Sequence, residues 1–206
     1  MHAMFDFETM GQDPDTKVVS LGGVAFNREG VIGRKYWVFD WENQPDRTED
    51  PDTAAWWQRQ KPEAREVFNT PKANRILSPA FVADLDAWLD SCAIDAGEVR
   101  DPKTGKLKEL KPWGNGANFD IVILEDIIRQ VHPKAKNGIP WAFWNVWCYR
   151  TFSAMTGCRD LIARNQLNTT VVKHNALADA EGQAMTVMEF WKLQDKRKAA
   201  KNGVKD

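Results

Sequence analysis

The chain has 206 residues, enough for one ordinary domain with its own core and too few for two domains to be expected. Apolar residues make up 43% and charged residues 28% of the sequence, which is typical of a globular protein and excludes a disordered or fibrous one. The formal net charge of -1 excludes a global positive field, so a polyanionic partner would need local basic patches or bound metal ions.

The cysteines and the apolar stretches indicate in which cellular compartment the protein is expected. Cys92, Cys148 and Cys158 fit neither a disulfide framework nor a Cys-x-x-Cys metal knuckle, which favours a reducing, cytoplasmic setting. An acidic residue at Asp6 leaves no room for a basic and apolar leader, so we expect no secretion signal. The most apolar stretch, Ile139 to Tyr149, is well below the ~18 residues needed to cross a bilayer. We therefore expect no membrane partner, and nothing in the sequence indicates the oligomeric state.

The first part of the chain reads as three strands followed by helices. Apolar and β-branched runs predict strands over residues 1–5, 18–26 and 32–41, with a turn at residues 11–15, and three consecutive strands suggest an antiparallel start. Apolar residues at helical spacing then predict helices over residues 53–60 and 79–92. Residues 95–111 are polar and contain a turn signal, so we expect an exposed hairpin or loop there.

The second part predicts a strand, two helices and a tail. A short strand and glycine turn over residues 112–116 precede a helix with an apolar side over residues 121–131, and a last long helix should begin near Leu177. The basic, apolar-poor residues 196–206 read as a frayed tail after a domain of residues 1–195. Mixed strands and helices without an internal repeat indicate an α/β layered domain.

Two carboxylates stand at the end of the first predicted strand. Asp6 and Glu8 are two residues apart, so both point to the same face, and Phe7 is expected to be buried on the other. Two such carboxylates can share one metal ion. Taken alone, the pattern is weak, because an Asp-x-Glu pair is more often a solvated strand end.

Two further motifs follow later in the chain. Asp120, in Asn118-Phe119-Asp120, opens an apolar helix and is placed either to cap that helix or to point back at the first pair. His174 precedes Asp179 by five residues at the start of the last helix. A lone loop histidine is more often surface structure, but this one is placed to lie beside a metal site to which Asp179 contributes.

In this order and at these separations, Asp-x-Glu, Asn-Phe-Asp and His-x-x-x-x-Asp resemble the motifs of the DEDDh exonuclease family of the RNase H-like superfamily. The resemblance extends from Met1 to about Gln194. It implies an RNase H-like mixed β-sheet, with its first three strands antiparallel and later ones parallel, flanked by helices. Residues 53–60 and 148–151 look most similar to the phage and bacterial branch that includes DexA and exonuclease VIII-like domains. Residues 114–118 depart from the Gly-His-Asn of proofreading epsilon subunits, which argues against a proofreading role.

The resemblance also implies a reaction. A 3′-5′ exonuclease of this kind hydrolyses phosphodiester bonds from the 3′ end of single-stranded nucleic acid and releases nucleoside 5′-monophosphates. Asp6, Glu8, Asp120 and Asp179 would hold two divalent ions, and His174 would be the general base. Hard oxygen ligands without thiolates favour Mg²⁺ or Mn²⁺.

The sequence indicates the substrate less clearly than it indicates the reaction. We favour DNA over RNA as the partner. An exoribonuclease that uses the same site is the alternative, because the sequence contains no recognisable motif for the 2′-hydroxyl contacts that distinguish RNA from DNA. A nucleic-acid-binding module without catalysis is a further alternative. Because Trp56 and Trp57 lie about 100° apart on a helix, one is expected to face the core and the other solvent, where it could stack a base. Arg150 could grip a phosphate or pair with a structural carboxylate. The candidate substrate contacts are Thr9, Met10, Trp57, Asn118, Phe119 and Arg150.

Overall fold

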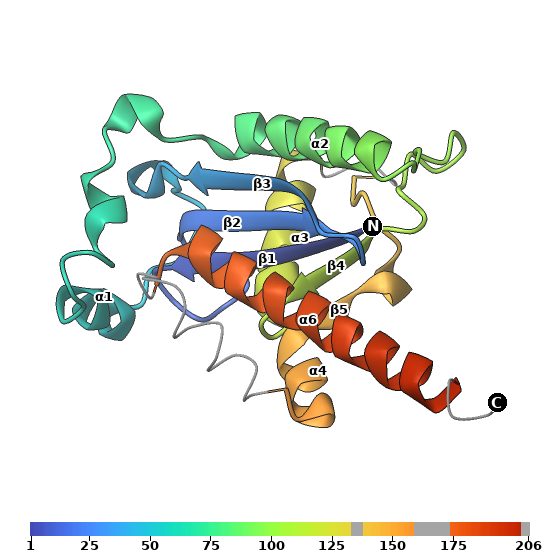
Figure 1. Ribbon diagram of the computed structural model, residues 1–206. Coiled ribbons are helices and arrows are strands. Elements are labelled where there is room, and N and C mark those ends of the chain that lie inside the picture. Colours follow the sequence, from blue (N-terminus) through green and yellow to red (C-terminus); the bar gives the residue numbers. More distant parts are fainter. Residues whose placement is uncertain (133–137, 159–173, 203–206) are drawn as a thin grey trace.

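A computed structural model describes residues 1–132, 138–158 and 174–202 (Figure 1). Five strands form one sheet in the order β3-β2-β1-β4-β5. Their bounds are His2–Thr9 (β1), Val18–Phe26 (β2), Val31–Val38 (β3), Lys111–Gly114 (β4) and Trp147–Cys148 (β5). The first three strands pair antiparallel, and β4 and β5 add to the sheet in parallel. This mixed sheet confirms the predicted α/β fold class.

Helices cover both faces of the sheet. The α-helices are Pro51–Gln58 (α1), Ser78–Asp95 (α2), Asp120–Val131 (α3), Tyr149–Thr156 (α4) and Ala176–Asn202 (α6). Short 3₁₀ turns lie at Trp41–Asn43, Glu66–Asn69, Lys72–Asn74 and Phe143–Asn145. In Figure 1, α6 crosses in front of the sheet and α3 lies behind it. No helix in these described ranges is both long and apolar enough to cross a membrane.

Side-chain alternation along β1 divides the interior into two layers. Ala3, Phe5 and Phe7 belong to the larger apolar cluster, which α2 and α3 complete. Met4 points to the opposite face, into the cluster formed with α6 and α4. Because strand side chains alternate between faces, Asp6 continues the row of Met4 and lies on the α6 side.

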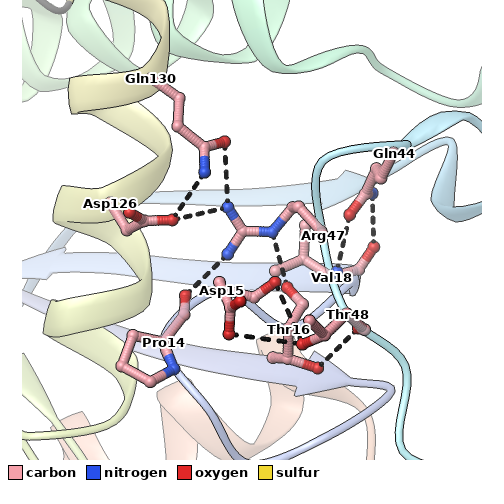
Figure 2. Close-up of polar contacts among 9 residues, drawn as sticks. All are labelled: Pro14, Asp15, Thr16, Val18, Gln44, Arg47, Thr48, Asp126 and Gln130. Atoms are coloured by element: carbon pink, nitrogen blue, oxygen red, sulfur yellow. Dashed lines mark hydrogen bonds and ion pairs between the residues drawn. The ribbon is translucent and has the colours of Figure 1, made fainter.

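A buried arginine ties the loop after β1 to α3, as Figure 2 shows. The Arg47 side chain is 2% exposed, and its guanidinium donates to the carbonyls of Pro14 (2.8 Å) and Thr16 (2.6 Å). It also donates to Asp126 of α3 at 2.9 Å and to Gln130 at 3.2 Å. The loop after β1 and the body of α3 are thereby held to one another.

Two regions differ from the sequence-based expectation. The segment 95–111, predicted to be exposed, contains Leu107 and Leu110, which are 1% and 0% exposed and join the main core. Its turn lies at the surface while these two leucines anchor it. Helix α6 continues to Asn202, so residues 196–202 extend the last helix rather than fraying, although their side chains are exposed. The remaining residues of the predicted tail lie outside the described ranges, and the domain boundary at residue 195 stays a prediction.

Candidate active site

The end of β1 carries the first two acidic side chains of the site. Asp6 lies opposite Gly22 of β2 and Glu8 lies opposite Ser20, both in antiparallel register, and Phe7 between them is buried on the other face. The register shifts between Glu8 and Thr9, so the regular pairing ends immediately after the second carboxylate. The predicted placement of both carboxylates on one face is therefore confirmed.

A glycine on β2 allows α6 to come close to these carboxylates. A Cβ atom at Gly22 would lie 2.2 Å from the carbonyl oxygen of Ala176 and 2.4 Å from the Cα of Leu177. Those distances are far inside van der Waals contact, so only glycine allows the first turn of α6 to pack here. The close packing brings Asp179, in that first turn, within reach of β1. Carboxylate oxygens of Asp6, Glu8 and Asp179 lie within 4.8 Å of one another.

Asp120 joins the same group from α3. A Cβ atom at Gly114 of β4 would lie 2.8 Å from the Cβ of Asp120, so the absence of a side chain at that position lets α3 begin close against the sheet. The Asp120 carboxylate accepts the backbone N–H of Phe7 at 3.1 Å. Of the two placements that the sequence left open for Asp120, its carboxylate takes the one that points back at the strand of the first pair. We call Asp6, Glu8, Asp120 and Asp179 the carboxylate cluster.

Burial and mutual repulsion disfavour the ionised forms of the carboxylates in the cluster. Burial, followed by the charges of Asp179 and Asp120, raises the pKa of Glu8 from 4.5 to about 8. Burial raises the pKa of Asp120 from 3.8 to about 7, against the hydrogen bond from Phe7. The pKa of Asp6 also lies well above 3.8, because of burial and the charges of Asp120 and Glu8. Such a group is stable as four anions only with a compensating cation.

The donor set fits hard divalent cations. It consists of carboxylate oxygens without a thiolate, and Mg²⁺ and Mn²⁺ prefer oxygen ligands of this kind. Glu8 is 8% and Asp120 2% exposed, whereas Asp6 and Asp179 are half-buried, so the cluster opens to solvent at one side. The cluster thus has the ligands, the charge and the access that a metal centre requires.

His174 lies at the entry to α6, next to Asp179. Its backbone N–H donates to the Asp179 carboxylate at 3.0 Å, and its φ of 64° places it in the left-handed region. The neighbouring Asn175 caps the helix by accepting the N–H of Ala178 at 3.1 Å. The imidazole packs edge-on against the ring of Trp56, with 4.9 Å between centroids. The backbone bond thus holds residue 174 next to Asp179, and the aromatic contact packs its half-buried imidazole against Trp56.

Comparison with known proteins agrees with this geometry. The model of the 3′-5′ exoribonuclease Rv2179c-like domain family matches residues 1–191. The chain belongs to this family. The domain is thus a 3′-5′ exonuclease domain, as the DEDDh motifs predicted.

Individual proteins similar to the exonuclease domain include one from a phage and one from a bacterium. The exodeoxyribonuclease of Enterobacteria phage T4 is 26% identical over 180 residues, which are 77% of this chain and 73% of the phage protein. Among solved structures, E. coli Exonuclease I in complex with a dT13 oligonucleotide matches with a TM-score of 0.58 at 14% identity, over 97% of this chain. Its complex with a dA16 oligonucleotide matches with a TM-score of 0.53 at 15% identity, over 89% of this chain. The exonuclease domain spans 42% and 39% of those two chains, and at these identities the likeness shows the fold.

The predicted substrate contacts are placed unevenly in the exonuclease domain. Thr9 and Met10 are 8% and 9% exposed, and the Thr9 hydroxyl donates to the Gly11 carbonyl at 2.6 Å. Trp57 is 3% exposed and donates its indole N–H to the Thr9 carbonyl at 2.8 Å, so it supports the end of β1 from within. The other member of the tryptophan pair, Trp56, is half-buried and is the more exposed of the two rings.

The other predicted contacts lie around the glycine turn before α3. Asn118 and Arg150 are exposed, and Phe119 is half-buried. Arg150 donates to the Asn115 carbonyl at 3.0 Å, so neither a phosphate nor a structural carboxylate is needed to hold it. Its positive charge partly offsets the rise that burial causes in the pKa of Asp120, which places the guanidinium near the carboxylate cluster. All six substrate contacts stay predictions.

Three contributors to the site were missed from the sequence. Gly22 and Gly114 act through close approaches of backbone, and no local pattern marks them. Gln183 donates its side-chain N–H to Asp6 at 2.8 Å. Its position four residues after Asp179 would have placed both side chains on one helix face, which is the signal that could have identified it.

Proposed function

We propose that this protein hydrolyses phosphodiester bonds one at a time from the 3′ end of single-stranded nucleic acid and releases nucleoside 5′-monophosphates. The observation that carries the proposal is the carboxylate cluster, in which oxygens from β1 and α6 lie within 4.8 Å of one another. Membership of a 3′-5′ exonuclease family supports the same direction of attack.

The chain's own residues divide the work of this reaction. Asp6, Glu8 and Asp179 would hold one Mg²⁺ or Mn²⁺ ion, and Asp6 with Asp120 would hold a second. When bound, two such ions stabilise the attacking and leaving oxygens of an in-line displacement. His174 would accept the proton of the attacking water, since a neutral imidazole is suited to that role near pH 7. Its backbone bond to Asp179 supports this role, because it holds residue 174 next to a proposed metal ligand.

Side chains around the carboxylate cluster would bind the end of the strand. Trp56 offers an aromatic face beside His174, and a base stacked on such a face typically contributes ~1–3 kcal/mol. Arg150 offers the free part of its guanidinium to a backbone phosphate at the edge of the cluster. A phosphate contact and a stacking contact do not distinguish one base from another, so we expect the enzyme to tolerate most base sequences.

Single-stranded DNA is our first candidate substrate, and RNA is the second. The similarity to a phage exodeoxyribonuclease supports DNA, whereas the exoribonuclease named by the family model supports RNA. We place the reaction in the cytoplasm because Cys92, Cys148 and Cys158 are all free thiols, as expected in a reducing compartment.

A degradation assay tests the proposal and separates the two substrates. DNA and RNA oligonucleotides of one sequence, labelled at the 5′ end, are incubated with Mg²⁺, Mn²⁺ or excess chelator. We expect a ladder of shortened labelled products with either ion and none with chelator or with Asp6→Asn. Turnover on DNA above that on RNA supports the first candidate, and the reverse supports the second. Undiminished cleavage by Asp6→Asn, or a labelled mononucleotide as the first product, would contradict the proposed reaction.

A further inference from the structure

Gln183 stands out among the polar side chains around the carboxylate cluster because it is not itself an acid. It lies on α6 one turn beyond Asp179, and the residue is 8% exposed. Its Nε2 donates to Asp6 Oδ1 at 2.8 Å. One face of α6 thus presents a carboxylate to the site and, four residues later, an amide to a carboxylate of β1.

The packing of α6 leaves this amide little freedom. Ala176, Ala180 and Ala184 recur every four residues along the helix and are 0% exposed, so small side chains hold α6 close to the sheet. At the helix start, Gly22 removes the side chain that would otherwise push Ala176 away. Because the backbone of α6 is fixed so closely against β2, the Gln183 side chain reaches Asp6 from a defined position.

The amide orientation favours an ionised Asp6. A hydrogen-bond donor aimed at a carboxylate stabilises its charged form, whereas the flipped amide would place two acceptors together. The other end of the same amide, Oε1, is buried and has no hydrogen-bond partner among the described residues. A buried amide oxygen of this kind normally has a partner, so it is an acceptor available to a donor that enters the site with a hydrated cation.

We propose that Gln183 is a positioning residue of the active site, whose amide orients the Asp6 carboxylate for divalent metal binding. The inference rests on the proposed function only in assigning Asp6 as a metal ligand. Gln183 bonds one oxygen of Asp6 and thereby restricts rotation of the carboxylate, so that Oδ2 would serve as the oxygen that binds the metal. Partners of metal ligands typically change metal affinity or activity by ~10–100-fold when they are removed.

Gln183→Met tests this role, because methionine matches glutamine in length and has no N–H to donate. We expect Mn²⁺ affinity, measured by titration calorimetry on the full chain, to fall by ~10–100-fold. The Mg²⁺ concentration needed for half-maximal turnover should rise by a similar factor, and kcat should fall while KM for the oligonucleotide stays within about twofold. Mn²⁺ affinity and kcat equal to those of the wild type would overturn the proposal.

Two further variants separate positioning from stability. Thr186→Val is the matched control: Thr186 lies on the same helix, is 1% exposed, and donates its hydroxyl to the Gly182 carbonyl at 2.8 Å rather than to a carboxylate. It should lower the melting temperature without changing Mn²⁺ affinity. If Gln183→Met fails to fold, Gln183→Glu replaces the donor with an acceptor of the same size, and wild-type kcat in that variant would also overturn the proposal. Should the wild type degrade no oligonucleotide, the proposed function fails, while the Mn²⁺ titration still decides the role of Gln183.

Discussion

Replacing Glu8 by glutamine should stabilise the metal-free protein, and should do so increasingly as the pH rises. Below pH 4.5 Glu8 is protonated in both the folded and the unfolded chain, so the substitution has little electrostatic effect. Between pH 4.5 and about 8, the unfolded chain releases the proton while the folded chain retains it, since the pKa of folded Glu8 is about 8. The free energy of unfolding of the wild type therefore falls with pH across this window and levels off above it.

The size of this change in the free energy of unfolding follows from the shift in the pKa of Glu8. One unit of pKa difference corresponds to about 1.36 kcal/mol, so a rise from 4.5 to about 8 corresponds to roughly 4 to 5 kcal/mol above pH 8. Glutamine occupies the same buried position without a charge and avoids this cost. Bound Mg²⁺ should narrow this gap, because a cation at 100 times its Kd stabilises the folded wild type by about 2.7 kcal/mol.

Thermal unfolding from pH 4.5 to 8.5, in chelator and in Mg²⁺, measures both effects. In chelator the gap in melting temperature between Glu8→Gln and wild type should widen steadily up to about pH 8. Glu29→Gln is the control, because Glu29 is an exposed glutamate in the turn between β2 and β3, and it should show no such trend. Parallel pH profiles of the Glu8 variant and the wild type in chelator would refute the reasoning.

Four other substitutions test three separate features. His174→Asn keeps a residue that tolerates the positive φ and removes the proposed base, so kcat should fall by ~10²–10⁴ with KM little changed; an unchanged kcat would contradict the assignment. Gly22→Ala places a methyl group 2.2 Å from the Ala176 carbonyl, so stability and turnover should both fall, whereas Gly182→Ala, with no atom within 4 Å, should stabilise α6 by up to about 1 kcal/mol in a denaturant titration. Arg47→Met should lower the free energy of unfolding by about 3 kcal/mol, because it leaves two carbonyls without the arginine donor and removes the cation paired with Asp126; a loss below about 0.5 kcal/mol would show that the network in Figure 2 contributes little.

Local patterns in the sequence predicted the elements that build the site. The β2 strand was predicted with the bounds that the structure shows, because an apolar run that contains β-branched residues favours a buried strand. Asp6 and Glu8 were placed on one face because strand alternation follows from backbone geometry alone. The tryptophan pair on α1 was expected to divide between core and solvent, but its sequence does not say which ring faces inward. Packing on Met10 and Val19 decides that Trp57 is buried.

What the sequence by itself determined is the order of the acids along the chain, the faces they occupy on their own elements, and the family that such an order resembles. Tertiary structure alone decided how closely they meet. Asp179 reaches Asp6 because Gly22 lets α6 approach, and Asp120 points to β1 because Gly114 lets α3 begin against the sheet. Gln183 becomes a partner of Asp6 for the same reason. Contacts of this kind depend on the space between elements distant in the chain, and spacing within one element carries no information about that space.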